Sequence, residues 1–147
     1  MSQTLTNDQR IEVPRRFMAE VFNGQKPERA RDFFTADALW HGPSIAEVTG
    51  VDNIVGLLGA FIGALTNIRA EEQSVIASGD LVALRLVVTA TQASDLLGIP
   101  SSGRPVRWDA VDIYRVTDDG KISEQWAFED MAAIGSQLGA FSLPWAN

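Results

Sequence analysis

The stretch from residue 106 to residue 130 constrains the fold more than any other part of the chain. Two segments rich in β-branched and aromatic residues flank the dipeptide Asp119-Gly120. This pattern is typical of a β-hairpin, and Asp-Gly suits a two-residue turn in which both central residues need a positive φ. If Asp118 pairs with Lys121, the register of both strands follows from the turn. The sequence therefore predicts two long antiparallel strands.

This register divides the hairpin between two faces. The first face is apolar with an ion pair near the turn, and its pairs are Val111 with Phe128, Ile113 with Trp126, and Arg115 with Glu124. The second face carries acids, an amide and a phenol around small side chains, and its pairs are Tyr114 with Gln125, Asp112 with Ala127, and Ala110 with Glu129. The second face either meets water, as in many antiparallel sheets, or lines a cavity. Trp108 and Tyr114 favour the cavity, because large aromatic side chains are costly in open solvent.

Composition excludes several classes of function. The chain has 147 residues, twelve Lys and Arg against nineteen Asp and Glu, a net charge of −7 and no cysteine. The basic residues are scattered apart from Arg15-Arg16, so nucleic acid is not an expected partner. Without cysteine there is no disulfide, thiolate metal site or cysteine nucleophile, which is consistent with a reducing compartment.

We expect a cytoplasmic protein that does not enter a membrane. Residues 1–10 are polar and show no signal peptide. The longest apolar run, from Ile54 to Leu65, is too short to cross a bilayer and is better interpreted as a buried helix.

The order of the remaining patterns predicts one α+β domain over residues 1–147. A helix is expected to end at about Asn23. It begins either at Asn7 or Asp8 and is kinked at Pro14, or near Val13 with Pro14 in its first turn. Its inward side chains are Phe17, Met18, Val21 and Phe22. The other expected elements are a short helix over 27–34, a strand over 38–41, an apolar helix from 50 to about 67, strands over 68–77 and 81–92 joined at Ser78-Gly79-Asp80, and a helix from 131 to about 138. Helices before a run of strands favour helices packed on one face of a curved antiparallel sheet.

Several motifs together resemble the SnoaL-like polyketide cyclase family over roughly residues 8 to 140, with tails over 1–7 and 141–147. They are Phe22-Asn23-Gly24, Leu39-Trp40-His41-Gly42-Pro43, Leu97-Gly98-Ile99-Pro100 with Gly103-Arg104-Pro105, Val111-Asp112-Ile113-Tyr114-Arg115, and Gln137-Leu138-Gly139. The resemblance implies a cone-shaped α+β barrel like nuclear transport factor 2, a deep and mostly apolar pocket, and a homodimer formed through the outer sheet face.

The resemblance also implies a chemistry from which this chain departs. Members of the family close a ring by intramolecular aldol condensation without metal or organic cofactor, using an aspartate on the last strand as acid and base. The matching position here is Ala127, whose methyl group cannot move a proton. Gln125 stands where relatives often have His. The matched polar positions that remain are His41 and Asp112.

Three residues are therefore candidates for catalysis: Asp112, Glu129 and His41. Asp112 lies directly across from Ala127 in the expected register, so its carboxylate could fill the space of the missing one. Glu129 is its diagonal neighbour, and an apolar pocket and a second acid both raise a carboxyl pKa toward neutrality. His41 is the only histidine, and we place it at the pocket mouth. The alternative for each is a structural role. The expected substrate-binding residues are Trp40, Trp108, Tyr114, Gln125, Ala127 and Phe17.

Three functions agree with these residues. The first is a cofactor-independent acid/base enzyme acting on an apolar, polyketide-like carbonyl compound. The second is water addition or epoxide hydrolysis in the same pocket, by Asp112 with His41 or Glu129. The third is a non-catalytic small-molecule binding protein, because the family's proton carrier is absent. No metal site or cofactor is expected, since no ligand spacing is visible.

Overall fold

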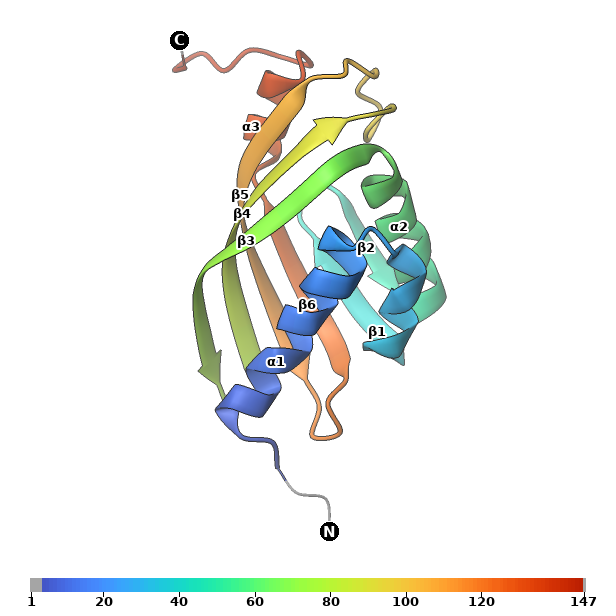
Figure 1. Ribbon diagram of the computed structural model, residues 1–147, viewed down its shortest axis with the longest axis vertical. Helices are drawn as coiled ribbons and strands as arrows, with labels where there is room; N and C mark the ends of the chain where they lie inside the picture. The colour runs from blue at the N-terminus through green and yellow to red at the C-terminus, as the bar shows by residue number, and fades with distance from the viewer. Residues whose placement is uncertain (1–3, 147) are drawn as a thin grey trace.

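The computed structural model describes residues 4–146, and it confirms the α+β class. Residues 1–3 and 147 of the expected tails lie outside the described residues. Six strands form one curved sheet in the order β2-β1-β6-β5-β4-β3 (Figure 1). They are β1 (Phe34–Gly42), β2 (Ala46–Thr49), β3 (Leu65–Ser78), β4 (Leu81–Gln92), β5 (Pro105–Val116) and β6 (Ile122–Glu129).

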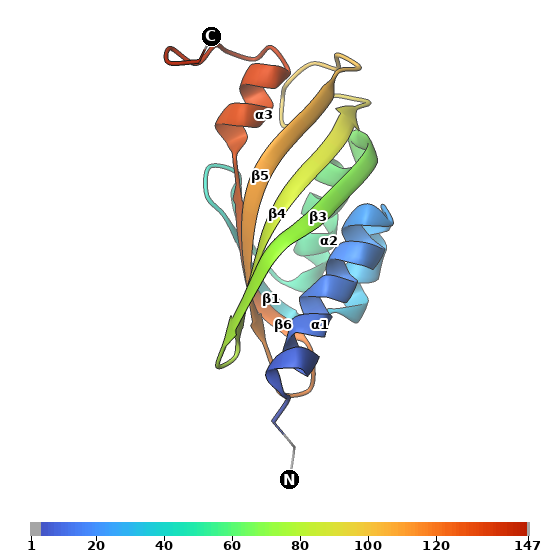
Figure 2. The ribbon, with the colours of Figure 1, turned by 60° about the vertical axis from the view of Figure 1, so that its left-hand side comes forward.

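Helical segments pack against this sheet. They are α1 (Asn7–Phe17), continued by a π-helical turn (Met18–Asn23), a 3₁₀ helix (Pro27–Asp32), α2 (Val51–Gly63) and α3 (Met131–Gln137). Figure 2 shows α1 and α2 on one side of the curved sheet and α3 at its far end. The core lies between the helices and the inner sheet face, where alternate residues of β4 such as Val82, Leu84 and Leu86 are buried. Each such side chain contributes about 1.5–3 kcal/mol by leaving water.

The hairpin register is confirmed, but the predicted turn is wrong. Only Gly120 of the turn has a positive φ, 81°, and Thr117 pairs with Lys121 around three turn residues. This is the three-residue turn that ends in a left-handed glycine. A shift in the pairing between Arg115 and Val116 then compensates for the extra residue. As a result Asp112 lies opposite Ala127, as the sequence predicts.

The sheet is mixed rather than wholly antiparallel, which corrects a second expectation. The strand expected at 38–41 begins at Phe34, and it runs parallel to β6. It also pairs with β2, which the sequence analysis did not identify. The residues of β2, Ala46 to Thr49, alternate between apolar and polar, but four residues are too few to mark a strand. This arrangement places Trp40 beside Gln125 on the inner face.

Two helix ends also differ from the prediction. The first helix is capped by Thr6, whose hydroxyl accepts a hydrogen bond from the Gln9 backbone N–H, while the Gln9 side chain accepts one from the Thr6 backbone N–H. The reciprocal pair satisfies two free donors, so Thr6 is a better cap than Asn7. The apolar helix ends at Gly63 instead of near Asn67, because Asn67 takes a positive φ of 54° at an irregularity in β3.

The outer sheet face carries an apolar belt. Ala83, Ile113 and Trp126 lie side by side across β4, β5 and β6, and Ile76 continues the row on β3. Val111 and Phe128 adjoin this row and are 38% and 45% exposed. Within residues 4–146, no helix is both long and apolar enough to cross a membrane.

Candidate active site

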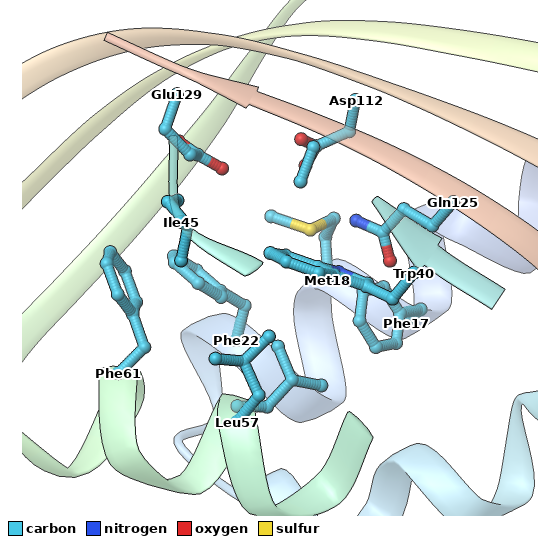
Figure 3. A pocket seen from close by; sticks show the side chains of 12 residues that line it. Phe17, Met18, Phe22, Trp40, Ile45, Leu57, Phe61, Asp112, Gln125 and Glu129 are labelled. Carbon is cyan, nitrogen blue, oxygen red and sulfur yellow. The ribbon is translucent and has the colours of Figure 1, made fainter. Parts of the chain in front are cut away.

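A mostly apolar pocket lies between the inner sheet face and the helices. Its helical wall consists of apolar side chains from α1, the π-helical turn and α2, namely Phe17, Met18, Phe22, Leu57, Leu58 and Phe61. The sheet contributes Trp40, Asp112, Gln125, Ala127 and Glu129, and the turn between β1 and β2 contributes Ile45. Figure 3 shows Asp112 and Glu129 directed from the sheet toward the helical side chains. The cavity alternative for the polar hairpin face is therefore confirmed.

The pocket is narrow. The space not filled by atoms is about 470 Å³, with the solvent at its mouth included, but only about 40 Å³ can take the centre of a water-sized sphere. That space suffices for about three waters. A larger ligand must displace side chains, and Met18 is suited to this because its unbranched thioether changes conformation easily. Its sulfur lies near the middle of the pocket in Figure 3.

The hairpin places two carboxyl groups next to each other in this pocket. Asp112 on β5 pairs with Ala127, and Glu129 on β6 pairs with Ala110, so the two acids are diagonal neighbours on one face. The small residues between them leave both side chains room to point inward. Asp112 is 3% exposed. Glu129 is half-buried as a residue, but its carboxyl group lies deep among protein atoms.

Each carboxyl group is held by one aromatic donor. The Tyr114 hydroxyl donates to Asp112 Oδ2 at 3.3 Å, and Trp108 Nε1 donates to Glu129 Oε2 at 2.5 Å. Neither acid forms an ion pair with Arg or Lys within the described residues. The pair thus lies in apolar surroundings without a compensating cation.

Burial raises the pKa of both acids. The pKa of Glu129 is raised to about 7 by desolvation, which outweighs the opposing effect of the Trp108 hydrogen bond. Desolvation also raises the pKa of Asp112 well above its ordinary value, and the neighbouring Glu129 charge adds to this. Two adjacent carboxylates in an apolar site cannot both ionise easily. Near neutral pH the pair therefore holds at least one proton.

Three buried polar atoms at the pocket have no hydrogen-bond partner among residues 4–146: Asp112 Oδ1, Gln125 Oε1 and Trp40 Nε1. Their residues are 3%, 3% and 5% exposed. A buried polar atom without a partner costs about 1–3 kcal/mol, so such atoms are rare unless a ligand or water satisfies them. These three atoms are thus available as hydrogen-bond partners for a polar group of a ligand in the pocket.

The structure brings together most of the residues that the sequence singled out. Phe17, Trp40, Gln125 and Ala127 line the pocket with the two acids. Trp108 and Tyr114 lie behind the acids as their hydrogen-bond donors, and they are 2% and 0% exposed. They therefore position the two acids and do not line the pocket, where the sequence analysis had placed them as substrate-binding residues.

The structure places His41 outside the pocket. Successive residues of a strand point to opposite faces, so Trp40 is inside and His41 is on the outer face. The His41 ring lies between the carboxylates of Glu47 and Glu124, at 2.5 and 2.7 Å, and stacks on Trp126. The Glu124 hydrogen bond, followed by that of Glu47, raises the His41 pKa against the effect of burial.

Sequence reasoning missed part of the lining. Leu57, Leu58 and Phe61 belong to the apolar helix, whose all-round hydrophobicity hides which side faces a ligand. Ile45 stands alone in a polar turn and gave no signal. No group of three or more His, Cys, Asp or Glu side chains within residues 4–146 is arranged as a metal site.

Solved structures share this fold. AclR of Streptomyces galilaeus, a proposed hydroxylase, is 26% identical with a TM-score of 0.81, and the match covers 93% of this chain and 100% of AclR. IdmH of Streptomyces antibioticus, a proposed polyketide cyclase, is 27% identical with a TM-score of 0.74 over 89% of this chain and 99% of IdmH. A proposed SnoaL-like polyketide cyclase from Jannaschia sp. CCS1 has a TM-score of 0.85 at 21% identity, over 97% of this chain and 99% of that one. No curated protein sequence matches the chain.

The curved sheet, its helices and the enclosed pocket thus define a protein of the nuclear transport factor 2-like fold. The sequence model of the SnoaL-like polyketide cyclase family matches residues 12–138. The chain belongs to that family.

The raised pKa of Glu129 predicts a stability that falls as pH rises. Between its ordinary value of 4.5 and about 7 the folded state holds more protons than the unfolded state, so the free energy of unfolding decreases with pH. The full difference is on the order of 3 kcal/mol, at about 1.36 kcal/mol per pKa unit. The free energy of unfolding of Glu129→Gln, measured by urea unfolding, should therefore rise relative to that of the wild type by up to this amount between pH 4.5 and pH 8.

The raised pKa of His41 also lowers stability as pH rises, so His41→Asn is the matched control. It should leave the difference between Glu129→Gln and its parent unchanged. A difference between wild type and Glu129→Gln that does not vary with pH would contradict the raised pKa of Glu129.

Proposed function

We propose that the protein is a cofactor-independent acid/base enzyme that transfers a proton on an apolar carbonyl compound of the polyketide type. The observation that carries the proposal is the pair Asp112 and Glu129, buried without a cation in an apolar pocket. Removal of a proton next to a carbonyl needs a base whose pKa lies near the working pH. Carboxyl groups in a cleft whose pKa is raised by burial and by a neighbouring charge are candidates for a functional site.

The pair can supply both a base and an acid. In its singly protonated form, the carboxylate takes a proton from the carbon next to the substrate carbonyl, and the C–H electrons move into an enolate. The carboxylic acid donates a hydrogen bond to the enolate oxygen. For ring closure, the enolate carbon bonds to a second carbonyl carbon of the same molecule, and the resulting alkoxide takes the proton from the pair. One proton is removed and one is returned.

We assign the proton transfer to Asp112 and a tuning role to Glu129. Asp112 lies across from Ala127, the position of the family's aspartate, and its Oδ1 has no partner within residues 4–146. Glu129 Oε2 is already bound by Trp108. The negative charge of Glu129 raises the Asp112 pKa, so the proton of the singly protonated pair rests mainly on Asp112. Asp112 acts as the base in the form in which this proton has passed to Glu129.

Water addition is less well supported by the pocket. It requires an acid and a base on opposite sides of one water. Asp112 and Glu129 both project from the sheet, while the helical side chains that line the pocket carry no titratable group. His41 cannot serve as the second group, because it lies on the outer face of the sheet.

The proposed chemistry can be tested without knowledge of the natural substrate. The assay is the exchange of the α-protons of 1-tetralone, a simple apolar ketone, with D₂O. The wild type should accelerate the deuterium uptake, followed by proton NMR. Asp112→Asn keeps the shape but removes the base, so the rate should fall by about 10²–10⁴-fold. Asp109→Asn, an exposed acid on the same strand, is the matched control and should be as fast as the wild type.

Two further variants separate an enzyme from a binding protein. Glu129→Gln should keep the exchange activity and move its pH profile to lower pH, because it removes the charge that raises the Asp112 pKa. Ala127→Asp would place a third acid beside Asp112 and should lower the rate or shift the profile. If the wild type binds 1-tetralone without accelerating exchange, or if Asp112→Asn is as fast as its parent, the assignment of Asp112 as the base is wrong.

We also propose that two copies of the chain associate through the apolar belt of the outer sheet face. Ile113 and Trp126 lie at its centre, and Val111 and Phe128 are exposed beside them. A contiguous apolar surface of this kind commonly marks a protein interface. The charged residues Arg115, Glu124 and His41 surround the belt and already bind one another or their neighbours, so they suit the rim of an interface.

Ile113→Lys should convert this dimer into a monomer, because it introduces an unpaired charge at the centre of the interface. Sedimentation velocity at micromolar concentration measures the change. Ala60→Lys adds the same charge on an exposed position of α2 and should remain dimeric. A wild type that sediments as a monomer would refute the proposed dimer.

A further inference from the structure

Ile45 lines two hollows at once. It forms part of the wall of the inner pocket, and it also lines a groove on the surface of the protein. The groove runs between the turn that joins β1 to β2, the loop that joins β4 to β5, and α3 with the segment that follows it. Figure 2 shows α3 and the β4–β5 loop at the same end of the molecule. Ile45 is therefore the residue at which the candidate active site and the groove adjoin.

The groove is larger than the pocket and mainly apolar. The space open to the centre of a water-sized sphere is about 570 Å³, against about 40 Å³ in the pocket. The side chains that line it are Ser44, Ile45, Leu97, Ile99, Met131, Ala132, Ala140 and Phe141, with Gly135 on α3. No Asp, Glu, Lys, Arg or His belongs to this lining within residues 4–146.

Two of these side chains are exposed at a cost. Leu97 is 45% exposed and has a φ of 50°, a left-handed conformation that a leucine adopts only with strain. Phe141 is 49% exposed. An asparagine at position 97 would suit both the backbone and the solvent better. Leu97 and Gly98 are the central residues of the turn closed by Leu96 and Ile99, and this turn holds the Leu97 side chain on the groove wall.

We infer that the groove is the second half of the ligand site and holds an extended apolar chain of the same molecule whose carbonyl group enters the inner pocket. The inference rests on the proposed function for the identity of the inner site. Ile45 then determines specificity, because the chain must pass it to reach Leu97 and Phe141. The narrow pocket supports this occupant, since it has room for a reacting end and little more.

The occupant is an apolar chain of the ligand and not a polar or charged group. The groove offers only one hydroxyl, that of Ser44, and otherwise presents aliphatic, methionine and aromatic side chains. Such walls gain affinity by excluding water and do not discriminate hydrogen-bonding groups. The site as a whole thus fits a molecule with a polar carbonyl end and a long apolar remainder.

The test is a series of phenyl ketones of increasing chain length: acetophenone, butyrophenone, hexanophenone and octanophenone. Binding to the full chain is measured by isothermal titration calorimetry. Once the chain passes Ile45, each further methylene should increase the affinity of the wild type about fourfold. Leu97→Asn should weaken octanophenone binding about tenfold and leave acetophenone within about twofold.

Ile45→Trp should block the passage and abolish the dependence of affinity on chain length. Because Ile45 also lines the inner pocket, the readout for this variant is the slope of affinity against chain length and not the acetophenone affinity itself. Leu39→Asn is the matched control, because Leu39 is 38% exposed and lies outside the linings of the groove and the pocket. It should bind every ketone as the wild type does. Far-ultraviolet circular dichroism and thermal unfolding establish that each variant is folded.

Affinity that does not rise with chain length in the wild type would overturn the inference. So would equal losses for acetophenone and octanophenone in Leu97→Asn. If a second copy of the chain covers the groove instead, Leu97→Asn changes the sedimentation and leaves ketone affinities unchanged. The outcome is independent of turnover: length-dependent binding without proton exchange would refute the proposed chemistry alone.

Discussion

The pairing of β5 with β6 is the constraint on which the rest of the structure depends. It places Asp112 across from Ala127 and beside Glu129, so that the two acids share one pocket. A slip of β6 by one residue against β5 would turn Glu129 to the outer face and bring Trp126 and Phe128 into the core, while Asp112 stayed inside. The three-residue turn and the irregularity near Arg115 offset each other, and this compensation keeps the acids inside.

Burial of two carboxyl groups without a cation is unfavourable for folding, and it makes them useful for chemistry. Desolvation raises both pKa values, and the two charges oppose each other. The Tyr114 and Trp108 hydrogen bonds stabilise the ionised forms, but only in part. The result is a pair that binds and releases a proton near neutrality, which isolated aspartate or glutamate in water does not do.

The absence of the family's aspartate is understandable in these terms. Ala127 removes one proton carrier from β6, and its small size leaves the space that the Asp112 side chain enters from β5. In the proposed function, the acid/base role therefore belongs to the opposite strand of the same pair and remains in the pocket. A residue-by-residue transfer of the family mechanism fails here, although the surrounding fold is the same.

The features of the pocket that depend on the alternation of side chains along a strand could be predicted from the sequence. The alternation within residues 106–130 assigned Asp112, Gln125 and Glu129 to one face, and the structure agrees. The position of His41 could not be predicted, because a short strand of unknown start leaves its inward side undefined.

Tertiary context decided the remaining features. The lining residue Ile45 and the strand β2 depend on the pairing of β1 with its neighbours, which no local pattern encodes. The turn at Asp119-Gly120 was wrong in detail, because Asp-Gly also suits the longer turn that ends in a left-handed glycine.

The central claim is that Asp112 and Glu129 share a proton near neutral pH. It is tested most directly by carbon-13 NMR of protein labelled at the Asp and Glu carboxyl carbons, titrated between pH 3 and 10. The Asp112→Asn and Glu129→Gln spectra assign the two signals. The account predicts that the pair loses its first proton with an apparent pKa of about 7 and its second at a higher pH. Two signals that both titrate below about pH 5, like ordinary carboxyl groups in water, would contradict it.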